Sequence, residues 1–120
     1  MATSRTNTSE AIYRLDTATG AAAIAASVAA IKATRVLQAA LHLSLAPTTS
    51  ESLTITINSA TGAAYDTLIY TLDLSTGSTI NLLWQPSAEL WLMPGDSLDI
   101  AWANTDTRTY GLSVVTKEVY

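Results

Sequence analysis

The sequence contains no cysteine and no phenylalanine, and it has a single histidine among its 120 residues. Without cysteine, the chain has no disulfide, no thiolate metal ligand and no cysteine nucleophile. The single histidine, His42, does not supply the set of nitrogen and sulfur ligands that a zinc site needs. These absences exclude disulfide-stapled domains and zinc-dependent enzymes.

Basic charge is also scarce. Six Lys and Arg residues stand against ten Asp and Glu residues, for a net charge of −4. The basic residues are scattered along the chain, so they cannot form the dense positive stripe that contacts phosphates. The longest apolar run, residues 20–31, is mostly Ala and shorter than the roughly 20 residues of a membrane span. The acidic residues that precede this run are not typical of a signal peptide. We expect neither nucleic acid nor membrane as a partner.

What the chain does contain is apolar: 48% of residues are hydrophobic and 13% are charged. This balance is too apolar for a disordered chain, and the length suits one core. We predict an N-terminal arm over residues 1–18 and a single domain over residues 19–120. The arm is polar, anchored only by Ile12, Tyr13 and Leu15, and is either an extended arm or a loosely held edge segment.

Alternating hydrophobicity dominates from residue 35 onward. The odd positions from Leu37 to Leu45 are apolar, with polar Gln38 and His42 between them. Further strands are predicted at 53–58, 65–74, 80–84, 90–93, 98–102 and 110–114, separated by turns rich in Gly, Pro, Asn and Asp. Seven or eight short strands predict an all-β fold, an antiparallel β-sandwich of jelly-roll-like form.

Residues 20–34 are ambiguous. Their alanines favour a helix. However, Ile24, Val28 and Ile31 form only a weak stripe, and no charged face would solvate the other side of a helix. Because the rest of the chain reads as β, we predict a strand here.

No motif indicates catalysis or a bound ion. His42 lies on the polar side of its strand and is expected to be a solvated surface side chain. There is no Gly-x-Ser-x-Gly elbow and no Asp-x-Asp-x-Asp loop. Aspartates in predicted turns usually cap backbone N–H groups; here they are Asp66, Asp73, Asp96, Asp99 and Asp106. We therefore predict no catalytic, cofactor or metal residues, and no enzyme activity.

The three tryptophans are the remaining candidates for function. Trp102 shares its strand face with Leu98 and Ile100 and is expected in the core. Trp91 lies between Leu90 and Leu92, so both faces of that short strand are apolar. A subunit interface would cover the second face. The predicted interface residues are Ile12, Tyr13, Leu15, Trp91 and Met93.

Four segments carry a resemblance to a known family: LHLSLAPTTSE (41–51), GAAYD (62–66), PGD (94–96) and ANTDTRTYG (103–111). The stretch from residue 41 to residue 112 resembles small virion proteins encoded among the head genes of tailed bacteriophages, of the capsid decoration or cement type. It covers more than half of the chain. The Ala-rich stretch before it is not part of the resemblance.

The resemblance implies a β-sandwich displayed on the capsid surface of the virion. Its partners would be the major capsid protein and further copies of itself, as a homotrimer at three-fold positions. The implied function is non-enzymatic: the protein binds the outside of the shell and stabilises it. The alternative is a receptor- or carbohydrate-binding β-sandwich domain of a phage fibre or surface protein, which would use exposed Trp and Tyr.

Overall fold

The computed structural model describes residues 12–119, which form strands and short turns. The strands are β1 (Ile12–Gly20), β2 (Ile24–Ala29), β3 (Thr34–Leu43), β4 (Ser52–Asn58), β5 (Thr67–Asp73), β6 (Asn81–Trp84), β7 (Trp91–Leu92), β8 (Ser97–Trp102) and β9 (Tyr110–Glu118). Two 3-10 turns, Ala63–Tyr65 and Thr76–Ser78, lie between strands. The all-β prediction is confirmed. Within this described range, no helix is long and apolar enough to cross a membrane.

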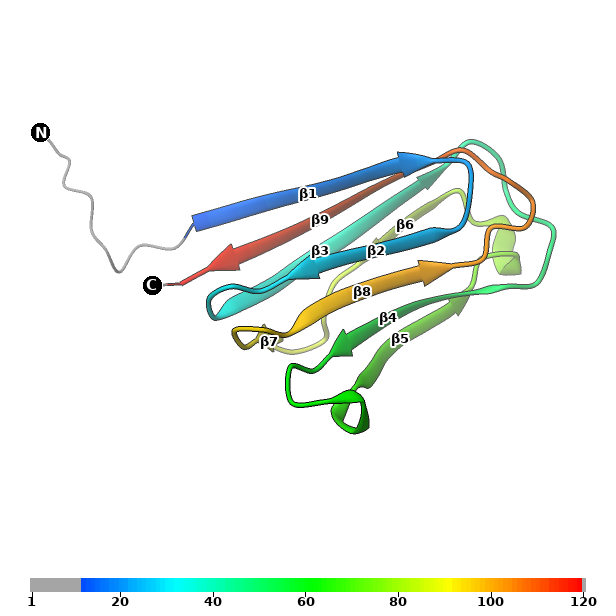
Figure 1. Cartoon of the computed structure of the whole chain (residues 1–120). Coiled ribbons are helices and arrows are strands. Elements are labelled where there is room, and N and C mark those ends of the chain that lie inside the picture. Colours follow the sequence, from blue (N-terminus) through cyan, green and yellow to red (C-terminus); the bar gives the residue numbers. More distant parts are fainter. Residues whose placement is uncertain (1–11, 120) are drawn as a thin grey trace, which may run out of the picture.

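The strands pair antiparallel into two sheets that form two layers (Figure 1). The first sheet has the order β1-β9-β3-β6, and β7 also pairs with β3. The second has the order β2-β8-β4-β5. The predicted antiparallel β-sandwich is confirmed.

The pairing is nested around the middle of the chain. β4 pairs with β5, β3 with β6, β2 with β8, and β1 with β9. Each pair encloses the previous one in sequence, as in a single long hairpin, and successive pairs alternate between the two sheets. The first and last strands therefore lie side by side (Figure 1).

The core lies between the sheets, and the strands supply it with alternate side chains. In β8, Leu98, Ile100 and Trp102 are buried, whereas Asp99 and Ala101 face away. Burying a side chain such as Leu or Ile contributes roughly 1.5–3 kcal/mol. Trp102 is 2% exposed, so its predicted core position is confirmed.

A β-bulge in β3 reverses this alternation. The register with β9 shifts between Val36 and Gln38. One extra residue in the strand moves the following side chains to the opposite face. Val36 and Ala39 are therefore buried, while Leu37 is not. Leu45 lies beyond the end of the strand and is 59% exposed. The predicted apolar stripe was wrong at Leu37 and Leu45.

The ambiguous Ala-rich stretch contains β2, so the strand prediction is confirmed. Ile24 and Val28 are 2% and 3% exposed, and Ala25 and Ala29 face outward. All six residues of β2 pair with β8. Pairing and burial outweigh the intrinsic helix preference of alanine, which is a weak effect.

The strand predicted from residue 65 begins later, at Thr67. A 3-10 turn occupies Ala63–Tyr65, and Gly62 before it has a φ of 142°. The Asp66 carboxylate accepts a hydrogen bond of 2.8 Å from the Ser59 N–H. This turn leaves Tyr65 64% exposed. The prediction was wrong at this end because the turn extends past Gly62.

Residues 12–18, predicted as part of the arm, belong to β1. All nine residues of this strand pair with β9, from Ile12 opposite Glu118 to Gly20 opposite Tyr110. Residues 12–18 therefore form an edge strand, in agreement with the edge-segment alternative, and this strand continues past the predicted boundary at residue 18. The remainder of the predicted arm, residues 1–11, lies outside the described residues.

Candidate functional site

His42 is exposed, as predicted. Its Nδ1 lies 2.7 Å from Oδ1 of Asn81. Among residues 12–119, no three His, Cys, Asp or Glu side chains come together as a possible metal site. Several acidic side chains instead bond to backbone groups of turns, whereas Asp99 lies within β8.

Two of these aspartates show the pattern. Asp96 accepts a hydrogen bond of 3.0 Å from the Met93 N–H. Asp106 accepts one of 2.8 Å from each of the N–H groups of Thr48 and Thr49. The N–H of Thr49, then its hydroxyl and the N–H of Thr48, lower the pKa of Asp106 to about 2. The predicted capping role is confirmed for both residues.

Other carboxylates tie together the loops at the same end of the sandwich as Asp106. The Ser50 hydroxyl donates to Asp73, and this bond is the main cause of the lowered pKa of that carboxyl. The Thr105 N–H donates to Glu51 at 3.0 Å. These carboxylates thus hold neighbouring loops together.

The candidate docking surface is the outer face of the first sheet, the side turned away from the core. Paired residues in antiparallel strands project to the same side, so the strand registers define this face. We call the following residues the outer face: Tyr13, Leu15, Thr17, Thr19, Arg35, Gln38, Ala40, His42, Asn81, Leu83, Trp91, Gly111, Ser113, Val115 and Lys117. None of them is acidic, although the chain carries a net charge of −4.

One row of this face joins two predicted interface residues. Tyr13 pairs with Lys117, Lys117 with Arg35, and Arg35 with Trp91. The Lys117 ammonium lies 5.4 Å from the centre of the Tyr13 ring, within the range of a cation–π contact. The row therefore places two cationic side chains next to each other in its middle, with an aromatic side chain at each end.

Glu89 borders this row from the loop between β6 and β7. Its Oε1 accepts a hydrogen bond of 2.6 Å from the Trp91 indole, and its Oε2 lies 3.9 Å from Arg35 Nη1. Glu89 thus fixes Trp91 and offsets part of the Arg35 charge. Lys117 makes its contact with an aromatic ring.

Large apolar side chains on the outer face are exposed. Tyr13 is 67%, Leu15 63% and Leu83 60% exposed. In the row of Leu83, the strands β3 and β9 carry the small residues Ala40 and Ser113, whereas Leu15 lies in the next row, opposite Val115. A shallow hollow of about 270 Å³ lies over these small residues. Large apolar side chains are therefore exposed on the two edge strands, β1 and β6, and the hollow lies between them over β9 and β3.

Two predicted interface residues lie beside the outer face rather than on it. Ile12 pairs with Glu118 in the row that faces inward, and it is 44% exposed at the start of β1. Met93 follows β7 and is 51% exposed. Its turn packs beside the turn that carries Ile31, which is 77% exposed, through the Gly95 N–H and the Ala30 carbonyl. These three side chains are exposed at the same end of the sandwich, where β1 begins, and we call them the apolar tip.

The outer face of the second sheet has a different character. Asp99 lies in its middle and accepts hydrogen bonds from Ser27, Ser97 and Asn58 at 2.7, 2.9 and 3.2 Å. Its polar groups already satisfy one another. The two outer faces are therefore unequal, and only the first combines cations with exposed apolar side chains.

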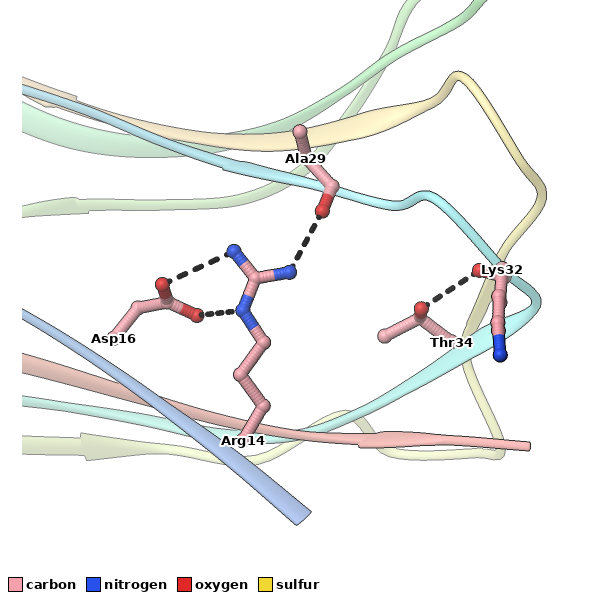
Figure 2. A network of polar contacts seen from close by, with 5 residues as sticks. All are labelled: Arg14, Asp16, Ala29, Lys32 and Thr34. Carbon is pink, nitrogen blue, oxygen red and sulfur yellow. Dashed lines mark hydrogen bonds and ion pairs between the residues drawn. The ribbon is translucent and has the colours of Figure 1, made fainter. Parts of the chain in front are cut away.

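Arg14, which is ion-paired with Asp16 in the same strand, bridges the two sheets at the open edge between β1 and β2, and sequence reasoning missed this contact. Figure 2 shows Arg14 reaching from β1 to the Ala29 carbonyl at 3.0 Å. Its Nε lies 3.0 Å from Asp16 Oδ2, and its Nη2 donates to Oδ1 at 3.2 Å. Charged side chains that point inward from an edge strand hinder pairing with another chain.

Comparison with known proteins adds no family: no protein-family model matches the chain, and no curated protein matches its sequence. Lys117 and Arg35 are the outer-face residues that the sequence did not single out. Their only signal was a Lys or Arg at an outward strand position, which is common at any protein surface.

Proposed function

We propose that this chain is a non-enzymatic structural protein of a phage virion, which binds the outside of the capsid and stabilises it. The observation that carries the proposal is the outer face of the first sheet. In an acidic chain, this face has no carboxylate, two cations and three large exposed apolar side chains. The resemblance to head-associated virion proteins supplies the identity of the partner.

Charge complementarity argues for an acidic patch on the capsid subunit as the occupant of this face. Lys117 and Arg35 would meet its carboxylates, while Tyr13, Leu15 and Leu83 would lose their exposed apolar area to it. Complementary charge mainly sets orientation and association rate, whereas apolar burial supplies affinity. Binding only to the assembled shell would stabilise that shell by mass action, and many symmetric copies would multiply the effect.

We further infer that the sandwich is a jelly roll. The support is the nesting of its pairs, β4 with β5 innermost and β1 with β9 outermost. In a jelly roll, one long hairpin is rolled up so that its successive strand pairs alternate between two layers. This topology is frequent in capsid proteins. Copies joined at the apolar tip of Ile12, Ile31 and Met93 would form the trimer that the resemblance implies.

The test is co-sedimentation with heads of the encoding phage assembled without this chain. The original chain is expected to pellet with the heads, and less of it as salt is raised. Leu15→Asp and Lys117→Glu should stay in the supernatant. Thr54→Asp, on the outer face of the second sheet and opposite Ala101 and Thr71, is the matched control and should pellet normally.

Two results would contradict the proposal in different ways. If the original chain does not pellet, the function is wrong. If all three variants pellet like the original chain, the function survives but the outer face of the first sheet is not the docking surface. Melting curves for each variant establish that a lost interaction is not lost folding.

A further inference from the structure

The opposite edge of the sandwich contains a hollow of about 460 Å³, which we call the edge pocket. It lies between β5, at the edge of the second sheet, and β6, at the edge of the first. Its walls are Ile69, Tyr70, Trp84 and the loop 85–90. The volume is within the range of roughly 300–1,000 Å³ that is usual for small-molecule sites.

The apolar wall of the edge pocket is aromatic. The rings of Tyr70 and Trp84 have centroids 6.0 Å apart and are tilted by 38°. Trp84 is 9% exposed and packs into the core, so its position is fixed by the fold. Leu90 and Pro86 complete the apolar part of the wall.

Apart from Glu89, the polar side chains of the edge pocket are neutral and make no hydrogen bond among the described residues. In the described part of the chain, the side chains of Tyr70, Trp84, Gln85 and Ser87 make no hydrogen bond with protein groups. The N–H groups of residues 87–89 are likewise without a partner among the described residues. Polar groups at the wall of a pocket usually have partners, and here a ligand would supply them.

The charged residue in the wall of the edge pocket, Glu89, already has partners. The Glu89 carboxylate accepts a hydrogen bond from the Trp91 indole and lies 3.9 Å from Arg35 Nη1. The residues that line the edge pocket include no cation. A phosphate, sulfate or carboxylate group would therefore find no counter-charge in it.

We propose that the edge pocket binds a neutral sugar ring, with the apolar face of a hexopyranose against Tyr70 and Trp84. Its hydroxyl groups exchange hydrogen bonds with the phenol of Tyr70, the amide of Gln85, the hydroxyl of Ser87 and the free N–H groups of the loop. A pyranose has one face of C–H groups and a rim of hydroxyls, which matches an aromatic wall beside neutral donors and acceptors. The pocket lies across the sandwich from β1, so this binding is independent of docking through the outer face.

The experiment is an NMR titration of the full chain with methyl glucoside, methyl galactoside, methyl mannoside and N-acetylglucosamine, following the three indole N–H signals. At least one sugar should give a saturable shift of the Trp84 signal, while the Trp102 signal, deep in the core, stays in place. Tyr70→Phe and Gln85→Ala should each weaken binding about fivefold, because each removes one hydrogen-bonding group. The matched control is Gln38→Ala, on the outer face of the first sheet, which should leave the affinity unchanged.

Three outcomes would overturn the proposal. They are no saturable shift with any of these sugars at millimolar concentration, a shift confined to Trp91, and binding that Tyr70→Phe and Gln85→Ala leave unchanged. Tyr70→Phe removes a single oxygen from a half-buried ring, so it is expected to fold. Its unshifted core signals confirm this in the same spectra.

Discussion

Replacing either partner of the Arg14–Asp16 ion pair should destabilise the protein, but by unequal amounts. The Asp16 Oδ2 atom is shielded from solvent, and its described partner is the Arg14 Nε at 3.0 Å. Arg14 has a second partner, the Ala29 carbonyl. Arg14→Met keeps the apolar stem and leaves the carboxylate without its partner, whereas Asp16→Asn keeps one acceptor oxygen for Arg14, which also retains the Ala29 carbonyl.

The magnitudes follow from this asymmetry. A fully buried, unpaired charge costs several kcal/mol, but both side chains here are 33% exposed, which reduces that cost. We expect Arg14→Met to lower the free energy of unfolding by about 2 kcal/mol. Asp16→Asn should lower it by about 0.5 kcal/mol. For a chain of this size, these values correspond to Tm losses of about 8 °C and about 2 °C.

Urea and thermal unfolding of the two variants, with the double variant to complete the cycle, measure both numbers. A loss for Asp16→Asn equal to or larger than that for Arg14→Met would refute the reasoning, because a stranded carboxylate would then not be the main cost. A more stable Arg14→Met would show that desolvation of the pair outweighs its attraction.

Three further predictions concern the core, the turns and the acid response. Leu98→Ala should cost about 2–5 kcal/mol by leaving a cavity, and Leu83→Ala on the surface less than about 0.5 kcal/mol, as chemical denaturation would show; similar losses would contradict the burial argument. Gly95→Ala should lower Tm more than Gly77→Ala, because both have positive φ but only at Gly95 does the new Cβ meet Ala60, at 2.9 Å; equal losses would contradict this. Because Asp106 has a folded pKa of about 2, below its unfolded value, its bonds stabilise the protein above about pH 4 and this stabilisation is lost as pH falls toward 2. The Tm gap between the original chain and Asp106→Asn should therefore be largest near neutral pH and close in that window, and a constant gap would exclude this cause.

The fold class could be predicted from the sequence because one face of most strands is buried. The period-two pattern in Leu98, Ile100 and Trp102 survives in the structure without change. Predictions failed where a single residue changed which side chains of a strand are buried, or changed where a strand begins or ends. The bulge at Leu37 is one case, since nothing in the local sequence distinguishes it from its neighbours.

The candidate sites were harder to foresee because each one is assembled across strands. Tyr13 and Trp91 were recognisable as apolar side chains without an evident place in the core. Their meeting in one row depends on the registers of β9 and β3, which a single sequence does not specify. The edge pocket brings Tyr70 beside Trp84 only once the two sheets face each other.

Nested pairing also sets the order in which the chain can fold. Ile57 meets Thr67 ten positions later, whereas Gly20 must find Tyr110, ninety positions away. Closing a long loop costs more entropy than closing a short one, unless the pairs inside it have already formed. Folding should therefore proceed from the β4–β5 hairpin outward, with rates typical of slow, non-local β topologies. β1 joins last in this scheme, so the strand that carries Tyr13 and Leu15 completes the outer face only after the rest of the sandwich exists.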